Sequence, residues 1–375
     1  MLVRDLVLAL DSIAPPFLAE PWDNTGLLVG SATAALAGPV MLTIDLGDAQ
    51  LDEAAAARCS AIISYHPPIF EPLRRINDTT RAGRVVLRAA AQGCAILSPH
   101  TALDAARDGL TDWLAGAIAS GSTERPRRAL VPAAPAPAGE HLKIITFAPA
   151  ETVAALRAAL AEAGAGCIGA YSHCSFSSAG TGTFLGSAGT SPAVGQAGRL
   201  ESVAEARLEM ICPRAALPGA LAALRRTHPY EEPAVDVFAL HPRPDESIGA
   251  GRVVTLDAPV SVAELARRLA ALLGPSAHIQ TTRDTQRPVR IIGLCPGAGG
   301  SLLAAARDAR CDAFITGELK HHESLSAIDS GLALILAGHT QTERGYLPIL
   351  ARRLAVALPG LSCLVSRTDA PPLTP

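Results

Sequence analysis

Three histidines in the sequence follow short apolar runs, each at the point where its run ends. His66 follows "AIISY", His100 follows "AILSP" and His339 follows "LALILAG". Asp104 lies four residues after His100, and Glu343 lies four residues after His339. On a helix this spacing places two side chains on one face, with Cβ atoms roughly 6 Å apart. The five side chains could therefore present nitrogen and oxygen ligands to one point.

Such a ligand set is typical of a divalent transition-metal site. Mixed imidazole and carboxylate ligands favour Zn, Fe, Mn or Ni over Mg or Ca. Five protein groups exceed what one tetrahedral ion with an open position needs, and a carboxylate can bridge two ions. A single histidine after a strand is usually a hydrogen-bonded loop residue. The repetition at three strand ends favours a metal site over that simpler interpretation.

Two further segments could contribute polar groups at strand ends. The glycine-rich "CPGAGGSLL" (295–303) could expose amide N–H groups to an anion, or could simply be a tight turn between a strand and a helix. In "ITGELKHHES" (315–324), we expect Lys320 and His322 to contact a substrate or the residues behind the metal ligands. The alternative is an exposed polar helix start.

Other catalytic arrangements have less support in the sequence. There is no GxSxG motif, and the one Cys–His neighbour pair, His173 and Cys174, lies in a Gly/Ser-rich segment that is not expected to hold a nucleophile. Trp22, Asp23 and Asn24 in "EPWDNTGLLVG" are typical of a capped turn.

The elements that would position the histidines alternate between apolar strands and amphipathic helices. Strands are expected at 40–46, 60–64, 94–98, 289–295, 311–316 and 332–338, and helices at 2–13, 48–59, 81–93, 101–119, 261–274, 301–309, 321–331 and 342–355. This alternation predicts a parallel sheet covered by helices. In such sheets ligands bind outside the carboxyl ends of the strands, where the histidines are expected to meet.

The middle of the chain departs from this rhythm. A Pro- and Ala-rich stretch beginning near residue 124 indicates a linker. The segment after it has a β-α-β-β-α-β order, which predicts a ferredoxin-like module. We therefore expect one α/β domain in two halves, residues 1–125 and 244–375, with a linker at 126–140 and an inserted α+β module at 141–243.

Composition narrows the functional classes. Of 375 residues, 49% are hydrophobic and 18% charged, and the net charge is −3 without long charged runs, which provides no electrostatic footprint for direct nucleic-acid binding. Apolar stretches are interrupted well before the ~20 residues that a membrane span needs. The eight cysteines contain no CxxC pair, which favours reduced thiols and a cytoplasmic protein.

Six sequence blocks, in order, resemble the Nif-three-like proteins, also labelled GTP cyclohydrolase I type 2-like. They are "PWDNTGLLVG", "SYHPPIF", "SPHTALDAARDGLTDWLA", "CPGAGGS", "ITGELKHHESLSAIDSG" and "AGHTQTERGYLP". The inserted "AYSHCSFSSAGTGTF", "EARLEMICP" and "THPYEEPAVDVFAL" resemble the middle module of longer members, which is similar to the CutA and PII folds. The resemblance spans nearly the whole chain and implies a three-layer α/β domain split by that module.

The resemblance also implies a dinuclear metal site. Carried over by motif, its ligands are His66, His100, Asp104, His339 and Glu343, with Glu343 as the bridge and with Glu343 and Asp104 as catalytic groups. The family further implies a toroidal homo-hexamer with its metal sites facing an internal cavity. As an enzyme, the chain would be a metal-dependent hydrolase acting on a nucleotide or a small phosphorylated or heterocyclic compound. The alternative is a non-enzymatic metal-binding regulator or scaffold with protein partners.

One position departs from the family pattern. Many relatives have His-His-Pro where this chain has Tyr65-His66-Pro67. A phenol with a pKa near ~10 is a poor ligand at neutral pH. One metal is therefore expected to have fewer protein ligands, to bind weakly, or to hold an extra water to which Tyr65 hydrogen-bonds. Tyr65 itself is expected to support the metal ligands from behind or to contact a substrate. This form resembles the eukaryotic members, which are discussed as partners of transcription regulators.

Overall fold

The computed structural model describes residues 1–119, 127–133, 141–241, 244–275 and 277–372. The chain divides into two compact units. The first combines residues 1–133 with 245–375, and the second spans 134–244. Among the described residues, no helix has both the length and the apolar character required to cross a membrane.

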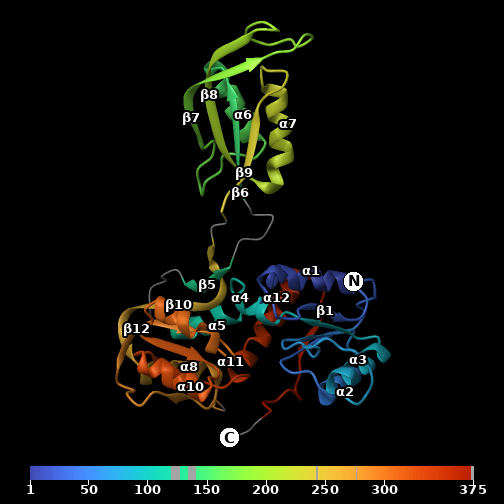
Figure 1. Cartoon of the computed structure of the whole chain (residues 1–375). Coiled ribbons are helices and arrows are strands. Elements are labelled where there is room, and N and C mark those ends of the chain that lie inside the picture. The colour runs from blue at the N-terminus through green and yellow to red at the C-terminus, as the bar shows by residue number, and fades with distance from the viewer. Residues whose placement is uncertain (120–126, 134–140, 242–243, 276, 373–375) are drawn as a thin grey trace. The chain divides into compact units, whose positions relative to one another are not determined.

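The first unit contains a five-stranded sheet from the N-terminal part of the chain. Its strand order is β1 (Gly26–Val29), β4 (Ala95–Ser98), β3 (Ala61–Ser64), β2 (Val40–Thr43) and β15 (Cys363–Val365), and only β1 runs antiparallel to its neighbour. Alternate residues face opposite sides, so that Met41 and Ile62 belong to one core while Leu42 and Ile63 belong to another. The helices on the first side are α2 (Asp48–Ala56) and α3 (Arg81–Ala91), visible side by side in Figure 1, and those on the second include α1 (Val3–Ile13) and α12 (Leu347–Ala357).

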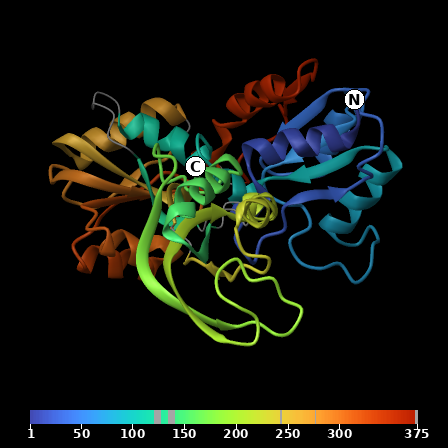
Figure 2. The same cartoon turned by 90° about the horizontal axis from the view of Figure 1, so that it is seen from above.

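A six-stranded sheet is built mainly from the C-terminal part. Its order is β11 (Gln280–Thr281), β14 (Ala333–Leu336), β13 (Ala313–Thr316), β12 (Pro288–Leu294), β10 (Asp245–Ser261) and β5 (Arg128–Ala133), with β12, β13 and β14 parallel. Figure 2 shows the blue strands of the first sheet and the orange strands of the second as separate sheets. One face packs on α5 (Leu110–Ile118) and α8 (Val262–Leu273), and the other on α9 (Leu303–Asp308) and α10 (His321–Asp329).

Each sheet is thus covered by helices on both faces, and one hydrophobic core continues from the first sheet to the second. The expected three-layer α/β class is confirmed. Two short helices, α4 (His100–Ala105) and α11 (Gln341–Arg344), directly follow the ends of strands and carry site residues.

Two local predictions are wrong, and one strand was not predicted. The linker expected at 126–140 contains strand β5, and residues 134–140 lie outside the described residues. Pro132 suggested an irregular segment, but β5 is the edge strand of its sheet, where a proline is tolerated. The 17-residue strand β10 begins the second half of the domain, where no element was assigned from the sequence. The helix expected at 101–119 is broken into α4 and α5 near Asp108, whose φ is 55°.

The second unit has the predicted β-α-β-β-α-β order. Its elements are β6 (His141–Ala148), α6 (Val153–Glu162), β7 (Ser175–Leu185), β8 (Leu200–Pro213), α7 (Leu217–Thr227) and β9 (Val235–Ala239). The sheet order β7-β8-β6-β9, with all pairs antiparallel, is that of a ferredoxin-like fold. The two helices cover one face with a core that includes Ile144, Leu156 and Leu224.

Candidate metal centre

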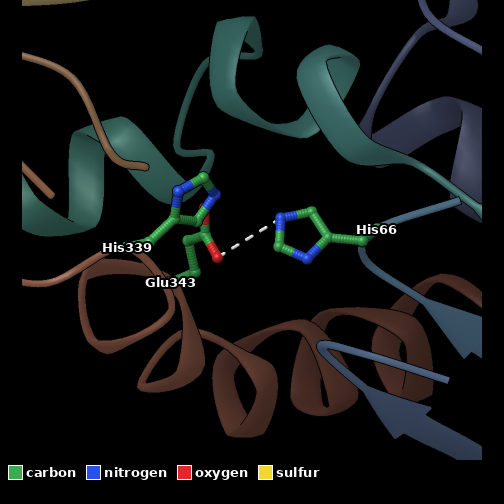
Figure 3. A group of neighbouring side chains, drawn as sticks. All are labelled: His66, His339 and Glu343. Atoms are coloured by element: carbon green, nitrogen blue, oxygen red, sulfur yellow. Dashed lines mark ion pairs between the residues drawn. The ribbon is translucent and has the colours of Figure 1, made fainter. Parts of the chain in front are cut away.

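Side chains that follow the parallel strands of both sheets meet within the first unit. His66 follows β3 of the first sheet, and His339 follows β14 of the second. One ligand atom from each of His66, His339 and Glu343 can be chosen so that all lie within 4.8 Å of one another. Figure 3 shows the Glu343 carboxylate between the two imidazole rings. Residues more than 270 positions apart in the sequence therefore form one cluster of metal-ligating groups.

Glu343 is the buried centre of this cluster. Its side chain is only 3% exposed, with Oε2 lying 3.5 Å from Nε2 of His66 and Oε1 lying 3.4 Å from Nε2 of His339. Within the described part of the chain, Oε2 accepts no hydrogen bond. A buried carboxylate oxygen without a donor is costly unless a cation satisfies it. The donor set and the unsatisfied oxygen both fit a divalent metal ion.

Each of the two histidines in this cluster is held by a carboxylate on Nδ1, the ring nitrogen that faces away from Glu343. Nδ1 of His66 lies 3.1 Å from Asp45 Oδ1, and Nδ1 of His339 lies 3.0 Å from Glu318 Oε1. These pairs fix the ring orientation and leave Nε2 free, which is how metal-binding histidines are commonly supported.

His100 and Asp104 lie next to this cluster. The His100 ring centroid is 5.3 Å from that of His66, and Nδ1 of His100 lies 2.7 Å from Asp23 Oδ1. His100 has a φ of 25°, an unusual backbone conformation for a residue with a side chain and one that is often found at functional sites. Asp104, on α4, accepts a hydrogen bond from a neighbouring phenol. Burial raises the pKa of Asp104 to about 7, although nearby partners partly offset this effect.

That phenol belongs to Tyr65, which was expected either to support the metal ligands or to contact a substrate. Its side chain is buried, and its hydroxyl donates a 2.6 Å hydrogen bond to Asp104 Oδ1. Burial and the neighbouring carboxylates raise the pKa of Tyr65 well above its ordinary value, so the phenol stays protonated. Tyr65 thus occupies one oxygen of Asp104 and contacts the His66 and His100 rings.

The electrostatics of the cluster follow from these pairs. The pKa of Asp45 is lowered, chiefly by its hydrogen bond to His66. Burial tends to raise the pKa of Asp23, but its hydrogen bonds with His100 and Thr101 lower it overall. For His66, burial opposes the charged form, yet contacts with Asp45 and Glu343 raise its pKa to about 10. The metal-free cluster therefore holds a proton on His66 at neutral pH.

The glycine-rich segment 295–303 contributes space to the site. Gly297 has a φ of 59°, and a Cβ atom there would lie 2.7 Å from Oε1 of Glu343 and 3.2 Å from Nε2 of His339. Only glycine combines this conformation with so close an approach. Gly297 therefore leaves room for the Glu343 carboxylate and the His339 ring.

Lys320 and His322 lie at the start of α10, and both are exposed. Lys320 is the residue that caps the helix, and the His322 ring packs against His321 with centroids 5.4 Å apart. Within the described part of the chain, neither side chain is seen in contact with the histidine cluster. Their role as substrate contacts stays a prediction.

Three carboxylates that support the histidines were not predicted as such. Asp23 was interpreted as part of a capped turn, Glu318 was only one of several polar residues after a strand, and Asp45 was not singled out. Asp45 and Glu318 lie two residues after β2 and β13, respectively, which is the position that His66 and His100 occupy after β3 and β4. A search for acidic residues at strand ends would have found both.

Comparisons with known proteins agree with the fold. A family model described as Duf34/NIF3 (NGG1p interacting factor 3) matches residues 1–372. A Mycobacterium bovis protein named "GTP cyclohydrolase 1 type 2 homolog" is 37% identical over 345 residues, covering 91% of this chain and 88% of that protein. The rat "NIF3-like protein 1" is 31% identical, covering 99% and 92%.

A solved structure also aligns over the full length. The crystal structure of a Bacillus cereus protein related to NIF3 has a TM-score of 0.72 and 28% identity, covering 100% of this chain and 98% of that one. The likeness thus extends to bacterial as well as mammalian proteins and is not confined to eukaryotic members. The family match over nearly the whole chain shows that it belongs to the Duf34/NIF3 family.

Proposed function

We propose that the first unit binds two divalent metal ions and uses them to hydrolyse a nucleotide or a small phosphorylated or heterocyclic compound. The observation that carries this proposal is the buried Glu343 carboxylate, whose oxygens face Nε2 atoms of histidines from both sheets. A carboxylate with two such oxygens can bridge two ions. The proposed ligands are His66, His100, Asp104, His339 and Glu343.

Bound ions at this site would supply Lewis acidity and would lower the pKa of water, the two effects on which metal-dependent hydrolysis depends. The protein residues orient the ligands. Asp45, Asp23 and Glu318 hold the Nδ1 sides of the three rings, and Nε2 of His66 and of His339 faces Glu343. Tyr65 donates to Oδ1 of Asp104, which leaves Oδ2 of that carboxylate for the site.

Support for a nucleotide or heterocyclic substrate comes from the relatives. Several carry the name "GTP cyclohydrolase 1 type 2 homolog", and a cyclohydrolase opens a heterocyclic ring with water. Because one fold and one metal site can serve many reactions, the substrate must be found by experiment.

The test begins with metal content. The purified chain, loaded separately with Mn, Fe, Zn and Ni, is expected to retain close to two ions per chain, while Glu343→Gln retains one or none. Exposed Glu71 provides a matched control, since Glu71→Gln removes the same charge outside the cluster. Fewer than one ion per chain in the unmodified protein would refute the dinuclear site.

A screen of nucleotides and phosphoesters then tests hydrolysis. We expect turnover that is lost in Glu343→Gln but kept in Glu71→Gln, with the same oligomeric state in both variants. Turnover that survives in Glu343→Gln would show that the reaction does not take place at this cluster.

A second candidate is a non-enzymatic regulator or scaffold. The family description, NGG1p interacting factor 3, names a protein interaction and favours this alternative. It predicts no turnover with any compound in the screen, together with partner binding that survives metal removal. We also propose a homo-hexamer, by resemblance to the family, which light scattering would test. A reducing, cytoplasmic compartment accords with the eight cysteines, all of which are free.

A further inference from the structure

The second unit contains a cavity of about 680 Å³ that the metal site does not involve. Its walls come from β7, from the loop at 190–194 and from the segment 230–234, which leads into β9. This volume lies within the range of about 300–1,000 Å³ that is typical of small-molecule sites. The motifs "AGTGTF" and "HPYEEPA", which the proposed hydrolysis does not use, both contribute to it.

The "HPYEE" segment is held rigidly by a buried histidine. Nε2 of His228 lies 3.1 Å from the carbonyl oxygen of Phe147, and Nδ1 accepts a 3.2 Å hydrogen bond from the backbone N–H of Tyr230. This pattern requires a neutral ring with its proton on Nε2, and burial lowers the pKa of His228 accordingly. The turn therefore presents Tyr230, Glu231 and Glu232 to the cavity in a fixed arrangement.

A third carboxylate enters the cavity from β8. Glu205 Oε1 accepts a 2.7 Å hydrogen bond from the Tyr230 hydroxyl. Its other oxygen lies against β7, where a Cβ atom at Gly182 would be 2.1 Å from Oε2. Because Gly182 has no side chain, the carboxylate of Glu205 can lie against β7 at this position. Gly180, two residues earlier, also lines the cavity, but a Cβ atom there would meet nothing within 4 Å.

The loop at 190–194 is hydrogen-bonded to the turn that carries Glu231 and Glu232. The backbone N–H of Ser191 donates a 3.2 Å hydrogen bond to Oε1 of Glu231. Pro192, Ala193 and Val194 of this loop line the cavity. The loop therefore supplies an apolar wall beside the carboxylates.

The charges that line the cavity are predominantly negative. Glu205, Glu231 and Glu232 are opposed by Arg207, whose Nε is already paired with Glu209 at 2.9 Å. In the described part of the chain, these carboxylates do not form a group close enough to hold a metal ion. The aromatic rings of Phe147, Phe184 and Tyr230 also line the cavity, and aromatic faces attract organic cations.

We propose that this cavity binds a small organic cation, an amine or guanidinium compound with an apolar body. The carboxylates of Glu205 and Glu232 would contact the charged group, while the aromatic rings and the loop at 190–194 would contact the body. The second unit would then sense a cationic metabolite independently of the metal centre.

The test uses the full-length chain and calorimetric titration with three cationic probes, phenethylamine, agmatine and spermidine. Neutral 2-phenylethanol and anionic phenylacetate serve as matched ligands of different charge. We expect saturable binding of at least one cation and of neither control ligand. Since hydrogen bonds to charged groups are strong, Glu232→Gln and Glu205→Gln should each weaken that binding about tenfold or more.

Two further variants make the result specific to the cavity. Gly180→Val places a side chain in open space on the cavity wall, and it should abolish binding while leaving the thermal unfolding temperature nearly unchanged. Glu162→Gln removes an exposed carboxylate at the end of α6, away from the cavity, and should bind like the unmodified chain. The proposal is overturned if no cation binds, if phenylacetate binds better, or if Glu232→Gln and Gly180→Val leave the affinity unchanged.

Discussion

Replacing Gly297 with alanine should weaken metal binding in addition to destabilising the fold. The residue has a φ of 59°, and a left-handed conformation costs a residue with a Cβ atom about 1–2 kcal/mol. In addition, the new Cβ would lie 2.7 Å from Oε1 of Glu343, closer than such atoms normally approach. The carboxylate must therefore move away from the two imidazoles that it faces at 3.4 and 3.5 Å.

Gly93 provides the matched control. Its φ is 62°, but a Cβ atom there would meet nothing within 4 Å. Gly93→Ala and Gly297→Ala should hence lose a similar 1–2 kcal/mol or so of unfolding free energy from backbone strain. Only Gly297→Ala should also lose metal affinity. Disturbing the groups that position metal ligands typically costs about 10–100-fold in affinity, equivalent to about 1.4–2.8 kcal/mol.

The assay measures the two effects separately. Thermal unfolding of chelator-treated protein reports the backbone strain, and competition titration with a metal indicator reports the affinity. If Gly297→Ala and Gly93→Ala bind metal equally well, then Glu343 is either not a ligand or free to move, and the proposed role of the glycine-rich segment is wrong.

Three other predictions concern different parts of the first unit. Arg252 is buried and donates to Asp112 at 2.8 Å and to four backbone carbonyls, so Arg252→Met should cost about 3–5 kcal/mol of unfolding free energy by removing the cation that pairs with the Asp112 carboxylate. Denaturant unfolding followed by tryptophan fluorescence measures it, because both tryptophans lie in this unit; a loss below about 1 kcal/mol would contradict the prediction. Burial tends to raise the pKa of Glu53, but hydrogen bonds from residues 366–368 lower it to about 2 from 4.5. Its stabilising effect is therefore present above pH 4.5 and is lost as the pH falls toward 2, so the protection of the Thr368 amide from hydrogen exchange, measured relative to the intrinsic exchange rate at each pH, should fall in that window. Glu53→Gln should show little protection at either end, and equal protection in both proteins would contradict this. Finally, His66 has a pKa of about 10 without metal, so metal binding at pH 7 should release at least one proton per chain. Calorimetry in two buffers of different ionisation enthalpy would detect the proton, and identical heats in both buffers would contradict the prediction.

Much of the candidate site could be predicted because its signals are local in the sequence. An apolar run followed by a histidine marks the carboxyl end of a strand, as it does for His66, His100 and His339. The four-residue spacing to Asp104 and Glu343 is likewise read within one turn of helix. The ferredoxin-like order of the second unit also follows from consecutive elements.

Other features depend on contacts between distant residues, which no local pattern encodes. Strand β5 pairs with β10, although the whole second unit lies between them in the sequence. Neither strand could therefore be assigned to its sheet from its own composition. The hydrogen bond from Tyr65 to Asp104 could not be predicted from local sequence, because the two residues lie 39 positions apart.

The sequence by itself determined the ligand types, the strand ends that carry them and the order of the elements, because each depends on residues only a few positions apart. The tertiary structure decided that Glu343 lies between histidines of two different sheets, and that Asp23, Asp45 and Glu318 support the rings. It also showed that the "HPYEEPA" motif lines a cavity. These pairings arise only when the strands of each sheet assemble and place separate loops side by side.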